Sequence, residues 1–182
     1  MCVFNLDHRK LQELAPFVER VLIVDPNMAS WRIISDLMKD MGARRIAHAT
    51  TTLRAMELLL ELEPQIVFTE LAGESLDGLN FTRHLRRSVS PSRRAPVIMA
   101  TATATAGTIL GARDSGVHEF LRKPFTGGDL FRRVENVITK YRPWVEANAY
   151  VGPDRRRFNS GEYAGPKKRG VDKGVPQPFE LA

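Results

Sequence analysis

Short apolar runs alternate along the chain with stretches in which apolar residues recur every three or four positions. Short apolar runs bounded by polar residues are typical of strands in a parallel sheet that is covered on both faces. A period near 3.6 residues predicts amphipathic helices. The segments assigned to strands are residues 20–25, 45–49, 65–70, 96–100 and 117–121. The pattern therefore predicts five strands, each followed by a helix.

Polar caps and glycines mark where the helices begin and end. Asn27 can cap the first of them and Gly42 can stop it. Thr51 or Thr52 opens the second, the third reaches Arg87, the fourth is a Thr/Ala/Gly-rich segment of weak propensity, and the last spans 126–140. The apolar residues expected to pack inward from the first two helices are Trp31, Ile34, Met38 and Met41, then Leu53, Met56, Leu59 and Leu60.

Five strand–helix units joined by short links predict an α/β protein, a flavodoxin-like doubly wound five-stranded parallel sheet. In such sheets the working residues gather where the strands end at their carboxyl termini. Here those ends carry Asp25, Glu70, Thr101 and Lys123. We expect these four side chains to lie close together at one edge of the sheet.

Composition divides the 182 residues into three parts. Residues 1–19 form an N-terminal arm, for which a short helix and a loose segment are both possible, and residues 20–140 form the domain. Residues 141–182 hold eight Lys/Arg against five Asp/Glu, and five of the eleven prolines. Such a stretch buries too little apolar surface to fold alone, which predicts a flexible basic extension.

Several classes of protein are disfavoured. Cys2 is the only cysteine, so no intrachain disulfide is possible, and no apolar run or leader suggests membrane insertion, which favours a cytoplasmic location. The four histidines lack metal-ligand spacing, and neither a Ser-His-Asp set nor a glycine-rich phosphate loop is apparent. We expect a protein without enzymatic activity.

The C-terminal extension contains a short repeat. The run YVGPDRRRF begins at Tyr150, and EYAGPKKRG returns to the same order of aromatic, glycine, proline and basic residues, with Tyr163 thirteen residues after Tyr150. An arginine can pair bidentately with guanine or phosphate and stack on a base. The carboxylate of Asp154 can accept from a guanine edge. The repeat therefore predicts a ligand that carries guanine and phosphate.

One set of motifs resembles the CheY-like receiver domain of two-component signalling. It consists of VLIVD, IVFTEL with Asp77-Gly78 seven residues after Glu70, then MATA and EFLRKPF, and covers roughly residues 20–140. In receivers an acidic pair holds Mg²⁺, an Asp that ends the third strand accepts phosphate, a Thr and a Lys sense it, and an aromatic swings inward. The positions that match are Asp25, Thr101, Lys123 and Phe120.

Two positions depart from the receiver pattern. Pro26 stands where the second acidic ligand belongs, so we do not expect Mg²⁺ to bind. Glu70 stands at the acceptor position and is one methylene longer than Asp, which misplaces its carboxylate for in-line attack. We expect no phosphorylation. Glu70 either mimics a phosphorylated Asp near Lys123 or forms a purely structural ion pair with it, and both readings stay open.

A receiver followed by Y-x-G-P-D-R-R also resembles the Cle group of CheY-like effectors. That resemblance implies binding of cyclic di-GMP, as a monomer or an intercalated dimer, and docking on a flagellar motor switch protein such as FliM, with recruitment to the flagellated pole. The docking face would be the fourth and fifth helices with the fifth strand. The expected ligand-binding residues are Arg142, Trp144, Tyr150, Gly152, Pro153, Asp154, Arg155, Arg156, Arg157, Tyr163 and Arg169.

Other interpretations remain. A phosphorylatable chemotaxis-type regulator with an incidental tail is one, and a nucleic-acid-binding protein that uses the basic tail is another, although the interleaved acidic residues disfavour it. A cationic arm that meets any acidic surface is the least specific. A second basic group, Arg83, Arg86, Arg87, Arg93 and Arg94, is expected to form a solvated face.

Overall fold

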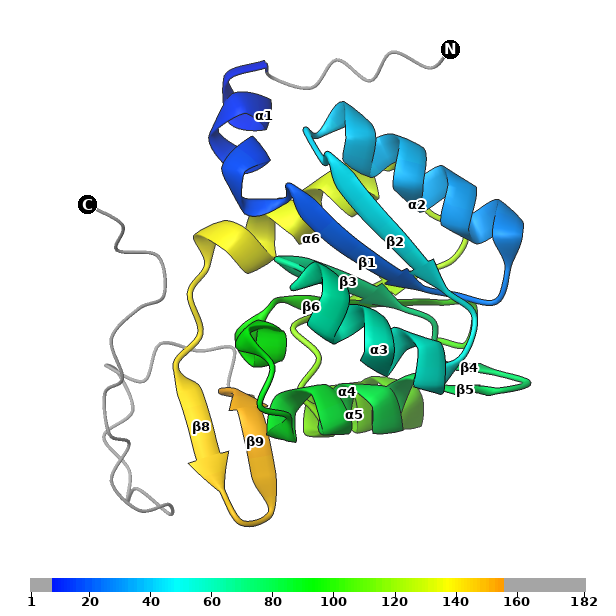
Figure 1. Cartoon of the computed structure of the whole chain (residues 1–182), viewed down its shortest axis with the longest axis vertical. Helices are drawn as coiled ribbons and strands as arrows, with labels where there is room; N and C mark the ends of the chain where they lie inside the picture. The colour runs from blue at the N-terminus through cyan, green and yellow to red at the C-terminus, as the bar shows by residue number, and fades with distance from the viewer. Residues whose placement is uncertain (1–7, 156–182) are drawn as a thin grey trace.

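Five parallel strands form the central sheet of the protein, seen in a computed structural model that describes residues 8–155 (Figure 1). Their order is β2-β1-β3-β6-β7, which is the doubly wound arrangement that the sequence predicts. The strands are β1 (Arg20–Val24), β2 (Arg45–Ala49), β3 (Ile66–Thr69), β6 (Val97–Thr101) and β7 (Glu119–Arg122). The predicted fold class is confirmed.

Helices cover both faces of this sheet. On one face lie α1 (His8–Leu14), α2 (Met28–Asp40) and α6 (Gly127–Thr139), and on the other lie α3 (Thr52–Leu62), α4 (Gly78–Arg87) and α5 (Ala106–Ser115) (Figure 1). Two short 3-10 helices, η1 (Ala15–Phe17) and η2 (Pro91–Arg94), and a small hairpin of β4 (Ala72–Gly73) and β5 (Leu76–Asp77) complete the domain. The molecule is thus a three-layer sandwich.

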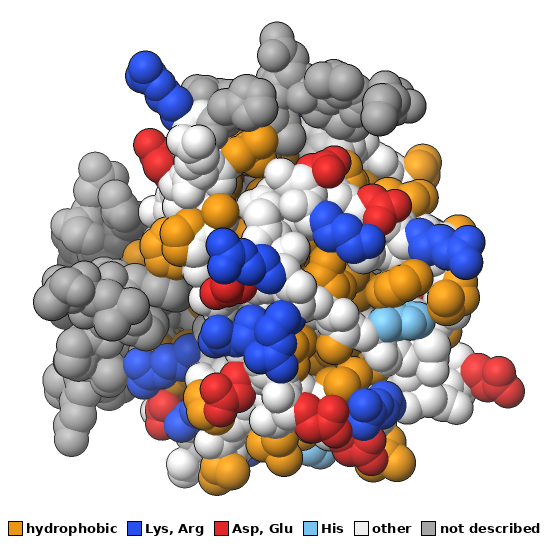
Figure 2. Space-filling view, turned by 45° about the horizontal axis from the view of Figure 1, so that its top comes forward, with side chains coloured by type: hydrophobic (Ala, Val, Ile, Leu, Met, Phe, Trp, Pro, Cys, Tyr) orange, Lys and Arg blue, Asp and Glu red, His pale blue; other side chains and the backbone are white. Residues whose placement is uncertain are grey.

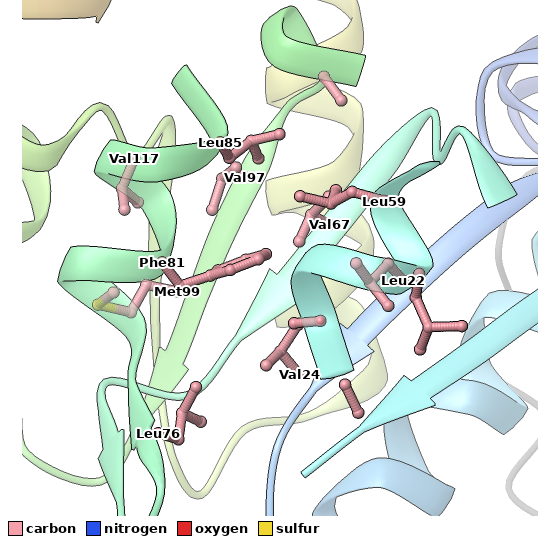
Figure 3. Packing of buried hydrophobic residues seen from close by; sticks show 14 of the residues in the cluster. Leu22, Val24, Leu59, Val67, Leu76, Phe81, Leu85, Val97, Met99 and Val117 are labelled. Atoms are coloured by element: carbon pink, nitrogen blue, oxygen red, sulfur yellow. The ribbon is translucent and has the colours of Figure 1, made fainter. Parts of the chain in front are cut away.

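Each central strand supplies side chains to both halves of the core. In β1, Leu22 and Val24 join the cluster under α3 and α4, whereas Val21 and Ile23 join the cluster under α2 and α6. Figure 3 shows the first of these clusters, in which Phe81 of α4 lies among side chains from the sheet. Burial on both faces explains why the strands read as continuous apolar runs.

Side-chain caps fix the helix starts close to the predicted positions. Asn27 accepts from the backbone amides of Ala29 and Ser30, and Thr51 accepts from that of Arg54. The inward face expected for α3 is wrong in part, because Leu53 and Leu60 are 73% and 63% exposed. The face that is buried consists of Ala55, Leu58, Leu59 and Leu62.

The N-terminal arm packs on the domain as a helix. Leu14 and Val18 are buried in the cluster under α2 and α6. The ammonium group of Lys10 lies 2.8 Å from a carboxylate oxygen of Glu135 in α6. Of the two possibilities left open by the sequence, the structure shows the helix.

The chain beyond α6 turns into an antiparallel hairpin, β8 (Trp144–Ala147) and β9 (Tyr150–Pro153). The composition of residues 141–182 predicts a segment without regular structure, and for residues 144–153 this is wrong. The hairpin packs against α4 and α5 (Figure 1), which supply partners for a segment that buries too little apolar surface to fold alone. Tyr150 is buried as a result, with 6% of its surface exposed.

Basic and acidic side chains lie next to one another over the face seen in Figure 2. The described ion pairs include Arg44 with Glu19, and Arg54 with Glu57 and Glu61. Among the helices of residues 8–155, none is long and apolar enough to span a bilayer.

Candidate functional site

The carboxyl ends of the central strands bring two carboxylates and one ammonium group together. The Lys123 side chain lies 2.6 Å from an oxygen of Asp25 and 2.6 Å from an oxygen of Glu70. Asp25 is 2% exposed, and the side chains of Glu70 and Lys123 are 15% and 17% exposed. The prediction that these three residues lie at the same site is thus correct, and the structure shows in addition that the ammonium group of Lys123 bridges both carboxylates.

Backbone amides hold the remaining carboxylate oxygens. Asn27 donates its N–H to the second oxygen of Asp25 at 2.8 Å, and Leu71 donates its N–H to the second oxygen of Glu70 at 2.7 Å. Each of the four carboxylate oxygens thus accepts a hydrogen bond from a fixed donor. Charge-assisted bonds of this kind are short and strong, so they hold both side chains in place.

The loop after β3 is shaped by two glycines. A Cβ atom on Gly78 would lie 2.0 Å from the carbonyl oxygen of Glu70, so only glycine allows α4 to start here. Asp77 caps that helix by accepting from the amide of Asn80 at 2.9 Å. A Cβ atom on Gly73 would lie 2.8 Å from the Pro26 ring, which places β4 and β5 against the position of the missing acid.

The other two receiver positions lie at neighbouring strands. Thr101 ends β6, is 3% exposed, and accepts the N–H of Thr103 on its hydroxyl at 3.2 Å. The backbone amide of Lys123 donates to the Thr101 carbonyl at 2.8 Å, which joins the ends of β6 and β7. Phe120 is half-buried and packs against the cluster under α3 and α4.

The donor set fits Mg²⁺ poorly. This cation requires near-octahedral oxygen ligands, several of them from water and carboxylates. Pro26 has no side-chain oxygen to offer, and the oxygens of Asp25 and Glu70 that face Lys123 are engaged with its ammonium group. A metal ion would have to displace that cation from both carboxylates.

One supporting residue at this site was missed by the sequence reasoning. The Nε2 atom of His48 lies 2.7 Å from the carbonyl oxygen of Asp25, and its ring stacks on Trp31 with centroids 4.9 Å apart. His48 lies in β2 one residue before its end, beside β1, and the parallel pairing of those strands is the signal that could have found it.

The C-terminal hairpin lies at the opposite end of the sheet. Arg86 of α4 donates to the carbonyls of Gly116, Arg93 and Ala95 at 2.8–3.0 Å, and these groups precede the starts of β7 and β6. Arg86 is 1% exposed, so the expectation that it lies on a solvated face is wrong. Four hydrogen bonds from its guanidinium satisfy carbonyls that strand starts would otherwise leave unpaired, and a fifth contact is with the ring of His118.

The charge of Arg86 affects a neighbouring histidine. The Nδ1 atom of His118 accepts the amide of Val97 at 3.2 Å and lies 3.1 Å from Arg86 Nη2. Burial, followed by the charges of Arg86 and Arg142, holds the pKa of His118 well below its ordinary value. Burial also lowers the pKa of Arg86 to about 9, which leaves the guanidinium charged at neutral pH.

The Y-x-G-P part of the repeat docks the hairpin. Tyr150 donates its hydroxyl hydrogen to the carbonyl of Pro153 at 2.5 Å, and burial raises the pKa of that hydroxyl to about 12. A Cβ atom on Gly152 would lie 2.7 Å from the Tyr150 hydroxyl and 3.1 Å from the Cα of Gly116. The glycine therefore lets the hairpin approach the loop between α5 and β7.

This docking changes the expected ligand contacts. The prediction gives Tyr150 an open stacking face and Asp154 a carboxylate free for guanine, whereas both residues are buried, with 6% and 7% exposed. Gly152 and Pro153 are buried as well. As they stand here, these four residues lie where the hairpin packs against the domain, beside α4, α5 and Gly116.

Arg155 is the first residue of the arginine run and the last that the structure describes. Its guanidinium carbon lies 4.6 Å from the centroid of the Tyr150 ring, and its Nη1 lies 2.8 Å from Asp114 of α5. Cation–π stacking and the ion pair hold the Arg155 side chain on the domain. Arg156, Arg157, Tyr163 and Arg169 lie outside the described residues.

The two upstream candidates lie at the start of this hairpin, where Arg142 precedes β8 and Trp144 is the first residue of β8. Arg142 pairs with Glu119 at 3.7 Å. The indole of Trp144 donates to Glu146 at 2.8 Å, and the guanidinium carbons of Arg86, Arg93 and Arg94 lie 5.4–5.9 Å from its ring centroid. The structure thus gathers an aromatic ring and several arginines at this end of the sheet.

The sequence of this chain is similar to those of known proteins. The family model described as "Response regulator receiver domain" matches residues 21–135. A chemotaxis protein CheY of Pseudomonas aeruginosa is 28% identical over 121 residues, which are 66% of this chain and 97% of that protein. The chemotaxis protein CheY-3 of Vibrio cholerae is 26% identical over 121 residues, again 66% of this chain and 92% of that protein.

Solved structures agree on the fold. A chemotaxis protein CheY4 of Vibrio cholerae superposes with a TM-score of 0.61 at 18% identity, covering 66% of this chain and 98% of that one. The receiver domain of a sensor histidine kinase from Pseudomonas aeruginosa, determined with a magnesium ion in its active-site cleft, has a TM-score of 0.60 at 24% identity and covers 68% and 99%.

Proposed function

Because the chain belongs to the response regulator receiver family, we propose that it is a signalling module without a catalytic step of its own, controlled by a nucleotide. In this proposal the C-terminal segment that begins at Arg142 binds cyclic di-GMP, and the receiver domain passes the result to a protein partner. The signal, which is binding of the nucleotide, then acts at the end of the sheet next to the β8–β9 hairpin, and not at the residue that follows the third strand.

The carboxyl-end site supports an input other than phosphorylation. A phosphoryl acceptor must be free to attack in line beside a metal ion. Glu70 instead accepts from Leu71 with one oxygen and from Lys123 with the other. A Glu70 carboxylate that mimics a phosphorylated Asp would pair with Lys123, and so would a carboxylate with a purely structural role. The ion pair between Glu70 and Lys123 therefore agrees with both interpretations.

The observation that carries the proposal is the anchored start of the arginine run. Arg155 is held on Tyr150 and Asp114, so the first arginine of the run has a fixed position on the domain. Anchoring lowers the conformational entropy that binding would otherwise cost, which is roughly 2–5 kcal/mol for ordering a flexible segment. Guanidinium groups and an indole suit a ligand that combines guanine bases with phosphates.

The proposed output is docking on a flagellar motor switch protein such as FliM, with recruitment to the flagellated pole. CheY proteins are the relatives at 26–28% identity. On α5 the side chains of Ile109 and Leu110 are 43% and 49% exposed, and Phe120 of β7 is half-buried nearby in the fold. An apolar surface of this kind suits a protein partner.

Calorimetric titration of the full chain with cyclic di-GMP tests the proposed ligand. We expect binding that Arg156→Ala weakens about fivefold or more, since a bidentate arginine contact is worth about 1–3 kcal/mol. Arg83→Ala is the matched control, because it removes one exposed arginine from α4, and it should leave the affinity unchanged. Equal affinities for the wild type and Arg156→Ala would reject the proposal.

Two further titrations separate the other candidate functions. An unrelated oligonucleotide titrated at two salt concentrations should bind weakly, whereas a nucleic-acid-binding protein would show tight binding with a steep salt dependence. Incubation with acetyl phosphate and Mg²⁺, followed by intact-mass measurement, should give no stoichiometric adduct. An adduct on Glu70 would identify a phosphorylatable regulator instead.

A further inference from the structure

We infer that Trp144, together with Arg93 and Arg94 of the receiver domain, forms the subsite for the planar, anionic part of the ligand, and that the carboxylate of Glu146 occupies this subsite beforehand. The inference rests on the proposed function for the identity of the ligand. Its structural basis is separate, because Arg93 and Arg94 belong to η2, outside the C-terminal repeat.

Two of the three arginines around the indole are accessible. The guanidinium carbons of Arg93 and Arg94 lie 5.9 and 5.4 Å from the ring centroid, and their side chains are 33% and 31% exposed. The guanidinium carbon of Arg86 lies 5.5 Å from the same centroid, but its N–H groups donate to carbonyls inside the domain. A ligand therefore meets Arg93 and Arg94, while Arg86 only adds positive charge behind the ring.

Arg94 has hydrogen-bonding capacity to spare. Within the part of the chain that the structure describes, its guanidinium forms no hydrogen bond, and its one ion pair is with Glu146 at 4.0 Å. Arg93 donates to the carbonyl of Arg86 at 3.3 Å and to Glu146 at 3.0 Å. The planar fork of an arginine is built for bidentate contact with a phosphate, and Arg94 can offer it complete.

Glu146 makes the contacts that a ligand oxygen would make. A single carboxylate oxygen accepts the indole N–H of Trp144 at 2.8 Å and faces Arg93 and Arg94 at 3.0 and 4.0 Å. The side chain is 50% exposed and extends from β8, so it can rotate into solvent. A phosphate that replaces it satisfies the same donors, and the released carboxylate regains water.

The combination selects a class of ligand. The half-buried indole is an aromatic surface on which a base can stack, and the guanidinium groups beside it require negative charge. Nucleotide phosphates carry both features. Trp144 also pairs with Pro153 across the hairpin, two residues before Arg155, so the subsite and the arginine run start from the same element.

Tryptophan fluorescence reports directly on this subsite. The chain has two tryptophans, and Trp31→Phe leaves Trp144 as the only one. In that background the full chain is titrated with cyclic di-GMP and, separately, with GMP. We expect Glu146→Gln to lower the dissociation constants of both nucleotides about fivefold, and Arg94→Ala to raise both about tenfold.

Two control variants make the same changes in charge as Arg94→Ala and Glu146→Gln, but away from the subsite. Arg83→Ala removes one exposed arginine elsewhere on the domain, and Glu57→Gln removes one carboxylate of 51% exposure on α3. Each should change the dissociation constants less than twofold. A tightening by Glu57→Gln equal to that by Glu146→Gln would mean that net charge alone acts, and would overturn the inference.

The outcomes separate the inference from the proposed function. If Arg156→Ala abolishes cyclic di-GMP binding while Arg94→Ala and Glu146→Gln change nothing, the subsite is wrong and the function stands. If GMP quenches Trp144 and responds to both variants but cyclic di-GMP does not bind, the subsite stands and the function is wrong. If neither nucleotide changes the fluorescence of any variant, the inference fails.

Discussion

The two ends of the sheet use buried cations in different ways. At the carboxyl end, Lys123 bridges the carboxylates of Asp25 and Glu70, so acidic and basic groups largely neutralise one another. At the amino end, Arg86 contacts carbonyl oxygens, a histidine nitrogen and the Trp144 ring, and within residues 8–155 no carboxylate pairs with it. The ion pairs of Lys123 occupy the site at the carboxyl end, whereas Arg86 adds positive charge to the surface beside the hairpin.

This difference bears on where a signal enters. An anion that approached the carboxyl end would meet two carboxylates and one cation, whereas at the hairpin end it would meet Arg93 and Arg94 with only Glu146 between them. The family fold is thus retained while the electrostatics favour anionic ligands at the other end of the strands. Changes that remove one cation at a time test the comparison.

The largest effect is expected from Arg86→Met. The methionine keeps an apolar stem but leaves the carbonyls of Gly116, Arg93 and Ala95 without donors. Buried acceptors that lose their partners cost about 1–3 kcal/mol each and do not add fully, so we expect a loss near 4 kcal/mol in the free energy of unfolding. Urea denaturation measures it. A loss below 1 kcal/mol, comparable to that of Arg83→Ala, would contradict the role assigned to Arg86.

Lys123→Met should have the next largest effect. It leaves Asp25 and Glu70 side by side without a cation, and the site is mostly buried. The expected loss is about 2 kcal/mol, between the values for exposed and for fully buried ion pairs. The same denaturation experiment at neutral pH gives the number. Unchanged or increased stability would show that the lysine does not hold the two acids.

A pH dependence of stability is expected from His118. Its folded-state pKa lies well below 6.5, so the unfolded chain binds more protons in this range, and stability falls as the pH drops below 6.5. Between pH 6.5 and 5.5 the loss attributable to this group is about 1 kcal/mol. His118→Gln should flatten the slope, and His84→Gln on exposed α4 should preserve it. Equal slopes in all three proteins would refute the assignment.

The smallest effect is expected from Tyr150→Phe. It removes the hydroxyl that donates to the Pro153 carbonyl and leaves the ring in place. A single such bond is worth about 1 kcal/mol of unfolding free energy. Tyr141→Phe, at a residue that is 47% exposed, is the control and should change stability by less than about 0.5 kcal/mol. Equal effects would mean that the tyrosine hydroxyl does not fasten the hairpin.

The fold was predictable because the strands are buried on both faces and the helix caps lie in the sequence. Asn27, Thr51 and Asp77 each accept from the first turn of the helix they precede. The inward face of α3 was the exception. Leu53 and Leu60 point away from the core and, with Val89, line an open apolar groove, and the helical period alone does not tell which of two apolar stripes is buried.

The site was predictable where strand ends define it and unpredictable where an extension docks. Asp25, Glu70 and Lys123 follow from the parallel order of the strands. The docking of Tyr150 depends on Gly116 and α5, which are remote in sequence, so composition alone made the hairpin look unstructured. Arg86 likewise reads as one more basic residue, because its partner Gly116 is 30 residues away and its role depends on how η2 folds back on α4.

The central claim, that the input has moved from the carboxyl end of the sheet to the hairpin end, is tested most directly by NMR of the ¹⁵N-labelled full chain. The two tryptophans give two indole N–H signals, from Trp31 near Asp25 and from Trp144 on β8. Cyclic di-GMP should shift the Trp144 signal, and beryllofluoride with Mg²⁺ should shift neither it nor the amide of Leu71. Shifts at Leu71 with beryllofluoride, and none at Trp144 with the nucleotide, would contradict the claim.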